Sequence, residues 1–164
     1  FEGGDSNQHS IRNGLWGLRD AGCDENDIIL VHDGVRPLVS ERIISENIEK
    51  CQKYGYAITG MICKEAIMQK VDDCVKNIDI PRERLVRTQT PHTYPLHTLL
   101  KAHEEADSKG IDGTVASCTL MAELGIEDQH LVMGSEKNGL KLTQTEDVEL
   151  FKALKHTTKD EWLK

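Results

Sequence analysis

Residues 27–37 read D-I-I-L-V-H-D-G-V-R-P, and this stretch decides the fold class. The short apolar run over Asp27–Val31 ends abruptly in polar residues, which is typical of a strand buried on both faces of a parallel sheet. His32, Asp33 and Arg36 follow at the carboxyl end of that strand. Ligands of open α/β sheets bind at this edge. The stretch therefore predicts such a buried strand and also the place of a site.

Amphipathic helices are expected on either side of this strand. Ser10–Ala21 carries apolar residues at helical spacing, and Gly22 follows as a natural stop. Ser40–Tyr54 has a second apolar face, with Ser40 as the N-cap and Glu41 in the first turn. A strand between two helices is the repeating unit of α/β proteins.

The rest of the chain continues this alternation. We expect strands over Tyr56–Cys63 and His130–Met133, and helices over Pro95–Ser108, Thr114–Leu124 and Thr145–Lys155. Lys64–Leu85 has no clear periodicity and is interpreted as an extended arm or a hairpin. The pattern predicts one three-layer α/β domain over residues 1–164 with a mostly parallel sheet. The polar residues 157–164 are expected to be a frayed end.

Composition narrows the class of protein. The chain has 164 residues, of which 38% are hydrophobic, enough for one domain with a core. No apolar run approaches the roughly 20 residues that cross a bilayer, and no basic-then-apolar leader opens the chain. We therefore expect a cytoplasmic protein with no membrane partner.

Charge and cysteine content exclude other classes. The formal net charge of -8 disfavours nucleic acid as a partner, although a few cations can still be focused in one cleft. The five cysteines form no C-x-x-C pair, so they are interpreted as reduced structural thiols. The seven histidines lack the spacing of a helical metal site, and no transition metal is predicted.

The strongest candidate for chemistry is the loop after the first strand. Asp33 can ligate Mg²⁺, a hard cation that bridges nucleotide phosphates, and Arg36 can hold a phosphate in a fork. The alternative is a structural turn in which Asp33 caps backbone amides and pairs with Arg36. Spacing alone does not decide between the two.

Three other segments are weaker candidates. Gly4 and Asp5 precede a helix, where bare glycine lets a ligand approach the backbone, although a simple loop explains them equally well. Thr90 follows a basic cluster that includes Arg82, and the alternative there is a solvated charged face. Lys141 stands before the last helix, where most lysines are merely solvated.

Taken together, four motifs resemble one family. In order along the chain they read G-G-D-x-x-x-x-S, V-H-D-x-x-R-P, R-x-x-L-x-x-x-Q-T-P and L-K-L-T-x-x-E-D. This order is similar to that of the 2-C-methyl-D-erythritol 4-phosphate and D-ribitol 5-phosphate cytidylyltransferases. The resemblance spans nearly the whole chain and implies a Rossmann-like nucleotidyltransferase fold with a projecting arm at about residues 62–85.

The resemblance also assigns roles to individual residues. It implies that Gly4, Asp5 and Ser10 surround the cytosine of CTP. It implies that Asp33 lies near the metal and the triphosphate. The positions associated with the acceptor phosphate or the reacting centre are then Arg36, Arg82, Thr90 and Lys141.

The reaction implied by the resemblance needs no side-chain nucleophile. A phosphate oxygen of a polyol phosphate attacks the α-phosphorus of CTP and displaces pyrophosphate, with Mg²⁺ and cations stabilising the developing charge. Members of the family form homodimers through the arm, so Arg82 is expected to serve the partner's site.

The chain also departs from the family pattern. The first strand and the glycine-rich loop that holds the triphosphate are missing, so we expect this polypeptide to be inactive alone. Glu65-Ala66 replaces an Asp-Thr pair, His92 replaces a Gln, and Gly113-Thr114-Val115 replaces an acidic segment. The altered arm favours D-ribitol 5-phosphate over 2-C-methyl-D-erythritol 4-phosphate as the acceptor.

Two alternatives to this reading remain open from sequence alone. One is a non-catalytic binding or dimerisation module, motivated by the missing loop. The other is a nucleotidyltransferase for a different sugar phosphate, since this fold serves many nucleotides.

Overall fold

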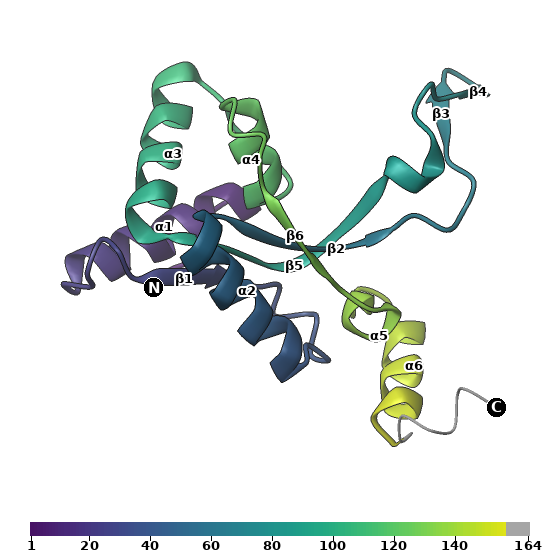
Figure 1. Cartoon of the computed structure of the whole chain (residues 1–164), viewed down its shortest axis with the longest axis horizontal. Helices are drawn as coiled ribbons and strands as arrows, with labels where there is room; N and C mark the ends of the chain where they lie inside the picture. Colours follow the sequence, from purple (N-terminus) through teal and green to yellow (C-terminus); the bar gives the residue numbers. More distant parts are fainter. Residues whose placement is uncertain (157–164) are drawn as a thin grey trace.

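The computed structural model describes residues 1–156, which form a body of helices around a sheet and a projecting arm (Figure 1). The expected frayed end, residues 157–164, lies outside the described residues. In chain order the elements are α1 (Asn7–Asp20), β1 (Ile28–Val31), α2 (Glu41–Tyr54), β2 (Ala57–Ile62), β3 (Met68–Val71), β4 (Cys74–Asn77), the short 3₁₀ helix η1 (Arg82–Arg84), β5 (Val86–Pro95), α3 (Leu96–Lys109), α4 (Ser117–Glu123), β6 (His130–Met133), α5 (Glu136–Gly139) and α6 (Thr145–His156).

Local signals in the sequence predicted several element ends. The Ser40 hydroxyl caps α2 by accepting a hydrogen bond from the backbone N–H of Ile43 at 3.4 Å, as expected. Gly110 ends α3 in the left-handed conformation, with φ of 67°. Helix α1 begins three residues before the predicted Ser10, because the Ser6 hydroxyl accepts from the N–H of His9 and so caps it earlier. Helix α4 begins at Ser117, later than the predicted Thr114.

The main sheet is mixed, although most of its strands run in one direction. Within the described residues its order is β1-β5-β2-β6. Strand β2 pairs in parallel with β6, whereas β5 lies antiparallel to both β1 and β2. The three strands β1, β2 and β6 therefore share a direction, in keeping with the predicted α/β class. The prediction that β1 is buried on both faces of a parallel sheet is wrong for the described residues, because β1 is an edge strand there, is only partly buried and pairs with antiparallel β5.

Strand β5 was not predicted, and it is the longest strand described. Its central residues include Pro91, which cannot donate a hydrogen bond to a sheet ladder. The register with β2 jumps from Ile58–His92 to Thr59–Gln89. Thr90 and Pro91 consequently lie in a bulge, where β2 needs no N–H from proline.

Two hydrophobic clusters cover the two faces of the sheet. Helices α1, α3 and α4 pack on one face, where Tyr94 and Leu99 are fully buried, and Ile29 contributes from β1. Helix α2 packs on the other face through Ile43, against Ala57 and neighbouring strand residues. Figure 1 shows these helices on opposite sides of the sheet. The expected three layers are therefore present.

The segment expected to form an arm leaves the body at the end of the sheet where β2 and β5 extend beyond β1 and β6. Beyond Ile62 the chain forms the hairpin β3–β4, whose turn holds Asp72 at φ of 53°. Figure 1 shows this hairpin well separated from the helical layers. No helix among residues 1–156 combines the length and apolar character that a bilayer span requires.

His103 of α3 carries an energetic cost inside the core. Its side chain is 1% exposed, and both ring nitrogens are buried without a hydrogen-bond partner. The ring meets Trp16 edge-on, with 6.2 Å between ring centroids. Burial lowers the pKa of His103 from 6.5 to about 4, and the charge of Asp107 opposes this only in part.

The depressed pKa of His103 predicts acid sensitivity. Between pH 6.5 and about 4 the unfolded chain binds a proton that the folded chain does not, so the free energy of unfolding falls as pH decreases through this window. The full loss from this residue amounts to about 3 kcal/mol. In His103→Leu we expect a shallower slope in denaturant unfolding measured across this window. His97→Leu, on the same helix at a partly exposed position, should keep the full slope; equal slopes in both variants would contradict this source.

Candidate functional site

A cavity of about 500 Å³ opens at the carboxyl end of β1. Its walls come from the loop after β1, the middle of β5, the start of α1, the residues that lead into α4, and Lys141 before α6. Four residues singled out from the sequence meet here: Asp33, Arg36, Thr90 and Lys141. The cavity thus lies where the sequence predicted a site, at the carboxyl end of β1.

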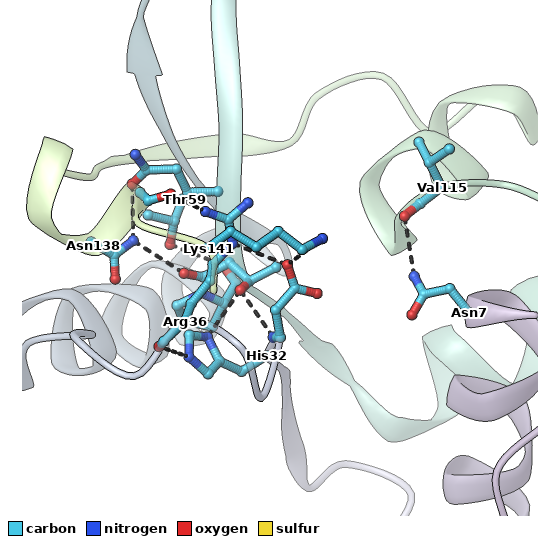
Figure 2. Close-up of polar contacts among 12 residues, drawn as sticks. Asn7, His32, Arg36, Thr59, Val115, Asn138 and Lys141 are labelled. Carbon is cyan, nitrogen blue, oxygen red and sulfur yellow. Dashed lines mark hydrogen bonds and ion pairs between the residues drawn. The ribbon is translucent and has the colours of Figure 1, made fainter. Parts of the chain in front are cut away.

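Asp33 is the centre of a charged cluster. Arg36 Nε donates to Asp33 Oδ2 at 3.0 Å, and Lys141 Nζ lies 3.4 Å from the same oxygen. The Arg36 side chain is 13% exposed and that of Asp33 25%, whereas Lys141 is 46% exposed. Figure 2 shows Arg36, Lys141 and His32 gathered at one side, with Asn7 and Val115 across from them.

The two cations decide the charge state of Asp33. Partial burial alone would raise the pKa of this carboxyl group, but the hydrogen bond from Arg36 and the positive charges of Lys141 and Arg36 together lower it below its ordinary value of 3.8. Asp33 is therefore ionised at neutral pH. Two positive groups beside one carboxylate leave a net positive charge facing the cavity, which suits an anionic ligand.

The hydroxyl group of Thr90 joins β5 to the loop after β1. It accepts a hydrogen bond from the backbone N–H of Asp33 at 3.1 Å and lies 3.0 Å from His32 Nδ1. His32 Nε2 lies 2.9 Å from the carbonyl oxygen of Arg36, so this nitrogen carries the proton of the neutral ring. Nδ1 then accepts from the Thr90 hydroxyl. This chain of hydrogen bonds fixes the loop that presents Asp33.

The cavity wall that carries Lys141 is anchored to β5. Gln89, 2% exposed, donates to the carbonyl of Ser135 at 2.9 Å and accepts from the side-chain amide of Asn138 at 2.9 Å. A Cβ atom at Gly134 or Gly139 would collide with the Gln89 amide, so a larger residue at either position would displace the amide from these hydrogen bonds.

The same wall also meets the loop after β1. Arg36 Nη1 donates to the carbonyl of Gly139 at 2.6 Å, and the N–H of Leu142 donates to the carbonyl of Val35 at 2.8 Å. These two contacts bring Lys141 within reach of Asp33 although the two residues are far apart in sequence.

The sequence that builds this site matches a known protein family. The family model described as "IspD: 2-C-methyl-D-erythritol 4-phosphate cytidylyltransferase" matches residues 1–156. The chain belongs to this family.

Individual relatives of this cytidylyltransferase family carry two different names. A ribitol-5-phosphate cytidylyltransferase of Lacticaseibacillus paracasei is 43% identical over 156 residues, covering 93% of this chain and 65% of the relative. A 2-C-methyl-D-erythritol 4-phosphate cytidylyltransferase of Acidobacterium capsulatum is 37% identical over 151 residues, covering 90% of this chain and 61% of the relative. The chain thus spans less than two thirds of the length of these curated relatives.

Solved structures of the cytidylyltransferase family share the fold. The 2-C-methyl-D-erythritol 4-phosphate cytidylyltransferase of Thermus thermophilus superposes with a TM-score of 0.80 at 28% identity, over 96% of this chain and 73% of that chain. The enzyme of Francisella tularensis superposes with a TM-score of 0.83 at 24% identity, over 93% of this chain and 69% of that chain, which is evidence for the fold alone.

The residues that resemble the family's cytosine site lie elsewhere. Gly4 precedes α1 and Ser10 lies within it, and the N–H of Gly4 donates to the Ser10 hydroxyl at 2.9 Å. That hydroxyl in turn donates to the carbonyl of Ser6 at 3.0 Å. Neither these residues nor the exposed Asp5 line the β1 cavity. The α1 residues that line it are Asn7 and Ile11.

Arg82 lies in η1, at the base of the arm and outside the β1 cavity. Its guanidinium group donates to the carbonyl of Lys64 at 3.1 Å and pairs with Glu83 at 3.5 Å. Within its own chain, therefore, Arg82 is separate from Arg36, Thr90 and Lys141, the other residues expected to bind the acceptor phosphate.

Sequence reasoning missed several residues of this site. His32 was given no role because it has no metal-ligand spacing. His92 was noted only as a departure from the family pattern, and Asn138 and Ser117 stand in segments without a motif. Among residues 1–156, no group of three or more His, Cys, Asp or Glu side chains is arranged to hold a metal ion. A divalent cation here would rely on one carboxylate, that of Asp33, together with ligand and water oxygens, which is a common arrangement for Mg²⁺.

The Thr90 hydroxyl can be tested by an isosteric change. Thr90→Val leaves the N–H of Asp33 and Nδ1 of His32 without their partner, which should lower the free energy of unfolding by about 1–3 kcal/mol. Urea unfolding followed by circular dichroism measures this loss. The matched control Thr98→Val makes the same change on α3 and should cost less than about 0.5 kcal/mol; an equal loss in both would remove the special role of Thr90.

Proposed function

We propose that this chain is the larger part of an enzyme that transfers CMP from CTP to a polyol phosphate and releases pyrophosphate. The observation that carries the proposal is the cluster of Asp33, Arg36 and Lys141 at the mouth of the β1 cavity. The carboxyl end of a strand is where an α/β sheet binds its ligand. The cluster also has the positive charge that binds the anionic oxygens of a nucleoside triphosphate and a phosphate. Membership of the cytidylyltransferase family supplies the reaction class.

The chemistry proposed for the cluster is electrostatic. A phosphate oxygen of the acceptor attacks the α-phosphorus of CTP while the bond to the β-phosphate oxygen breaks, so pyrophosphate leaves with that electron pair. Arg36 and Lys141 stabilise the charge on the phosphate oxygens, and Thr90 orients the loop that bears Asp33. When bound, Mg²⁺ neutralises the charge of the triphosphate, and Asp33 is the side chain that would hold it. Gly4, Asp5 and Ser10 are proposed to recognise the cytosine.

D-ribitol 5-phosphate is the proposed acceptor. The relatives from Lacticaseibacillus paracasei and Vibrio parahaemolyticus, both named ribitol-5-phosphate cytidylyltransferases, are 43% and 36% identical to this chain. The relative from Acidobacterium capsulatum, named for the methylerythritol phosphate, is 37% identical. The higher identity of the first relative, together with Glu65-Ala66 in the arm, favours ribitol phosphate. We also propose a cytoplasmic location, since both substrates are soluble metabolites of that compartment.

The arm is proposed to form a homodimer and to carry Arg82 into the partner's site. It leaves apolar side chains exposed, including Met68 at 47%, Val75 at 63% and Ile80 at 52%. A groove of about 520 Å³ runs along its base. Exposed apolar surface of this kind is typical of an interface. A partner's arm would also bring its Arg82 to the cluster of Asp33, Arg36 and Lys141.

Removal of one cation tests the reaction. With CTP, Mg²⁺ and D-ribitol 5-phosphate, Lys141→Ala and Arg36→Ala should each lower the rate of pyrophosphate release by about 10²–10³-fold, because each removes a charge that stabilises the transition state. Lys101→Ala, an exposed position on α3, is the control and should keep the full rate. The assay is run with the chain alone and with the chain joined to the part of the Lacticaseibacillus relative that the match leaves out.

The outcomes separate the alternatives. Release with ribitol phosphate alone supports the proposed acceptor, and release with 2-C-methyl-D-erythritol 4-phosphate alone replaces it. Activity only in the joined protein supports the expectation that the chain is incomplete. No release with either acceptor in either form would favour the non-catalytic binding or dimerisation module, and preference for another nucleotide would remove the cytosine assignment.

A charge on the arm tests the dimer. Ile80→Asp places a carboxylate in the proposed interface, so sedimentation velocity should show a shift from dimer to monomer. Leu150→Asp on α6 is the matched control, because Leu150 is 48% exposed against 52% for Ile80. A monomeric wild-type protein would rule out the dimer. In the joined protein, mixing Arg82→Ala with Lys141→Ala should restore part of the activity only if Arg82 acts in the partner's site.

A further inference from the structure

Two uncharged polar side chains also line the β1 cavity. They belong to His92 and Ser117, which are 2% and 3% exposed. The neighbouring lining residues Ile11, Val31 and Val115 are apolar. Within residues 1–156, His92 Nε2 and Ser117 Oγ are among the few buried side-chain polar atoms without a hydrogen-bond partner. Leaving such an atom unpaired costs free energy, so two of them among the residues that line one cavity indicate a bound partner.

His92 offers an acceptor to the cavity. It lies opposite Val31 in the β1–β5 register and is close enough to Asp33 and Arg36 to respond to their charges. The ring hydrogen-bonds to the backbone of Gln89, and since Nε2 makes no such bond, the other ring nitrogen carries the proton. Burial lowers the pKa of His92 to about 4, so the ring is neutral at pH 7. The lone pair of Nε2 is then free to accept.

Ser117 complements this acceptor. It is the first residue of α4, and its hydroxyl group can both donate and accept. A neutral acceptor and a hydroxyl group, set in an apolar wall, match the hydroxyl groups of a sugar or polyol and would bind a phosphate poorly. Arg36 and Lys141, the cations proposed to bind phosphate, line the same cavity.

We propose that His92 and Ser117 are specificity-determining residues that bind the hydroxyl groups of the ligand whose phosphates Arg36 and Lys141 hold. This inference rests on the proposed function, which supplies two hydroxylated ligands: the ribose of CTP and the carbon chain of the polyol phosphate. The hydroxyl chemistry is the same for both, so the experiment has to distinguish the source.

Calorimetric titration of the wild type, His92→Leu and Ser117→Ala with three ligands makes this distinction. The ligands are CTP, D-ribitol 5-phosphate and pyrophosphate, which carries no carbon-bound hydroxyl. We expect each variant to bind one of the first two about tenfold more weakly, and pyrophosphate with unchanged affinity. Weaker CTP binding identifies the ribose, and weaker ribitol phosphate binding identifies the polyol. His103→Leu is the control, because it removes another buried imidazole with unpartnered nitrogens away from this cavity.

A second measurement does not depend on the variants folding. In wild-type protein with ¹⁵N-labelled histidine, the Nε2 resonance of His92 should show an unprotonated nitrogen that shifts when the hydroxylated ligand binds and stays in place with pyrophosphate. Binding of CTP and ribitol phosphate with no shift at Nε2, or equal weakening of all three ligands, would overturn this inference and leave the proposed function standing. Failure of the wild type to bind either substrate, both as the chain alone and as the joined protein, would overturn both.

Discussion

The central position of β5 is the constraint on which the rest of the structure depends. This strand lies between β1 and β2 and carries polar side chains, Gln89 and Thr90, into a nearly solvent-free layer. Buried polar groups need partners, and a sheet ladder satisfies only their backbone atoms. Thr90 finds its partners in the loop after β1, and Gln89 finds them in the segment around Ser135 and Asn138. Pairing the buried polar side chains of this one strand therefore brings two walls of the cavity together, the loop after β1 and the segment that leads to Lys141.

That assembly explains how an acidic protein holds a cationic site. The chain has a formal net charge of -8, yet Arg36 and Lys141 meet at a single carboxylate. Coulomb interactions at this separation are stronger in a partly buried cleft than in water, so the local arrangement outweighs the distant negative surface. The same cations keep Asp33 ionised, which is the state in which it can bind a divalent cation.

Three histidines, His32, His92 and His103, show how differently one residue type is used. His32 is fully engaged between Thr90 and the Arg36 carbonyl and serves to shape a loop. His103 has no hydrogen-bond partner at either ring nitrogen and lies in the core against Trp16. His92 combines a bonded nitrogen with an unpaired one that faces the cavity. Only the last arrangement leaves a group available to a ligand.

The sequence by itself determined the features that depend on neighbouring residues. The apolar run of β1, the Ser40 cap of α2 and the strand His130–Met133 were predicted because periodicity and capping are local signals. Four ordered motifs were also enough to indicate the family. The tertiary structure alone decided the rest. It placed β5 in the sheet despite Pro91, it brought Lys141 to Asp33, it separated Arg82 and Ser10 from that cluster, and it turned His92 into a buried acceptor. These outcomes depend on which distant segments satisfy the buried polar groups of β5, and no local pattern encodes that choice.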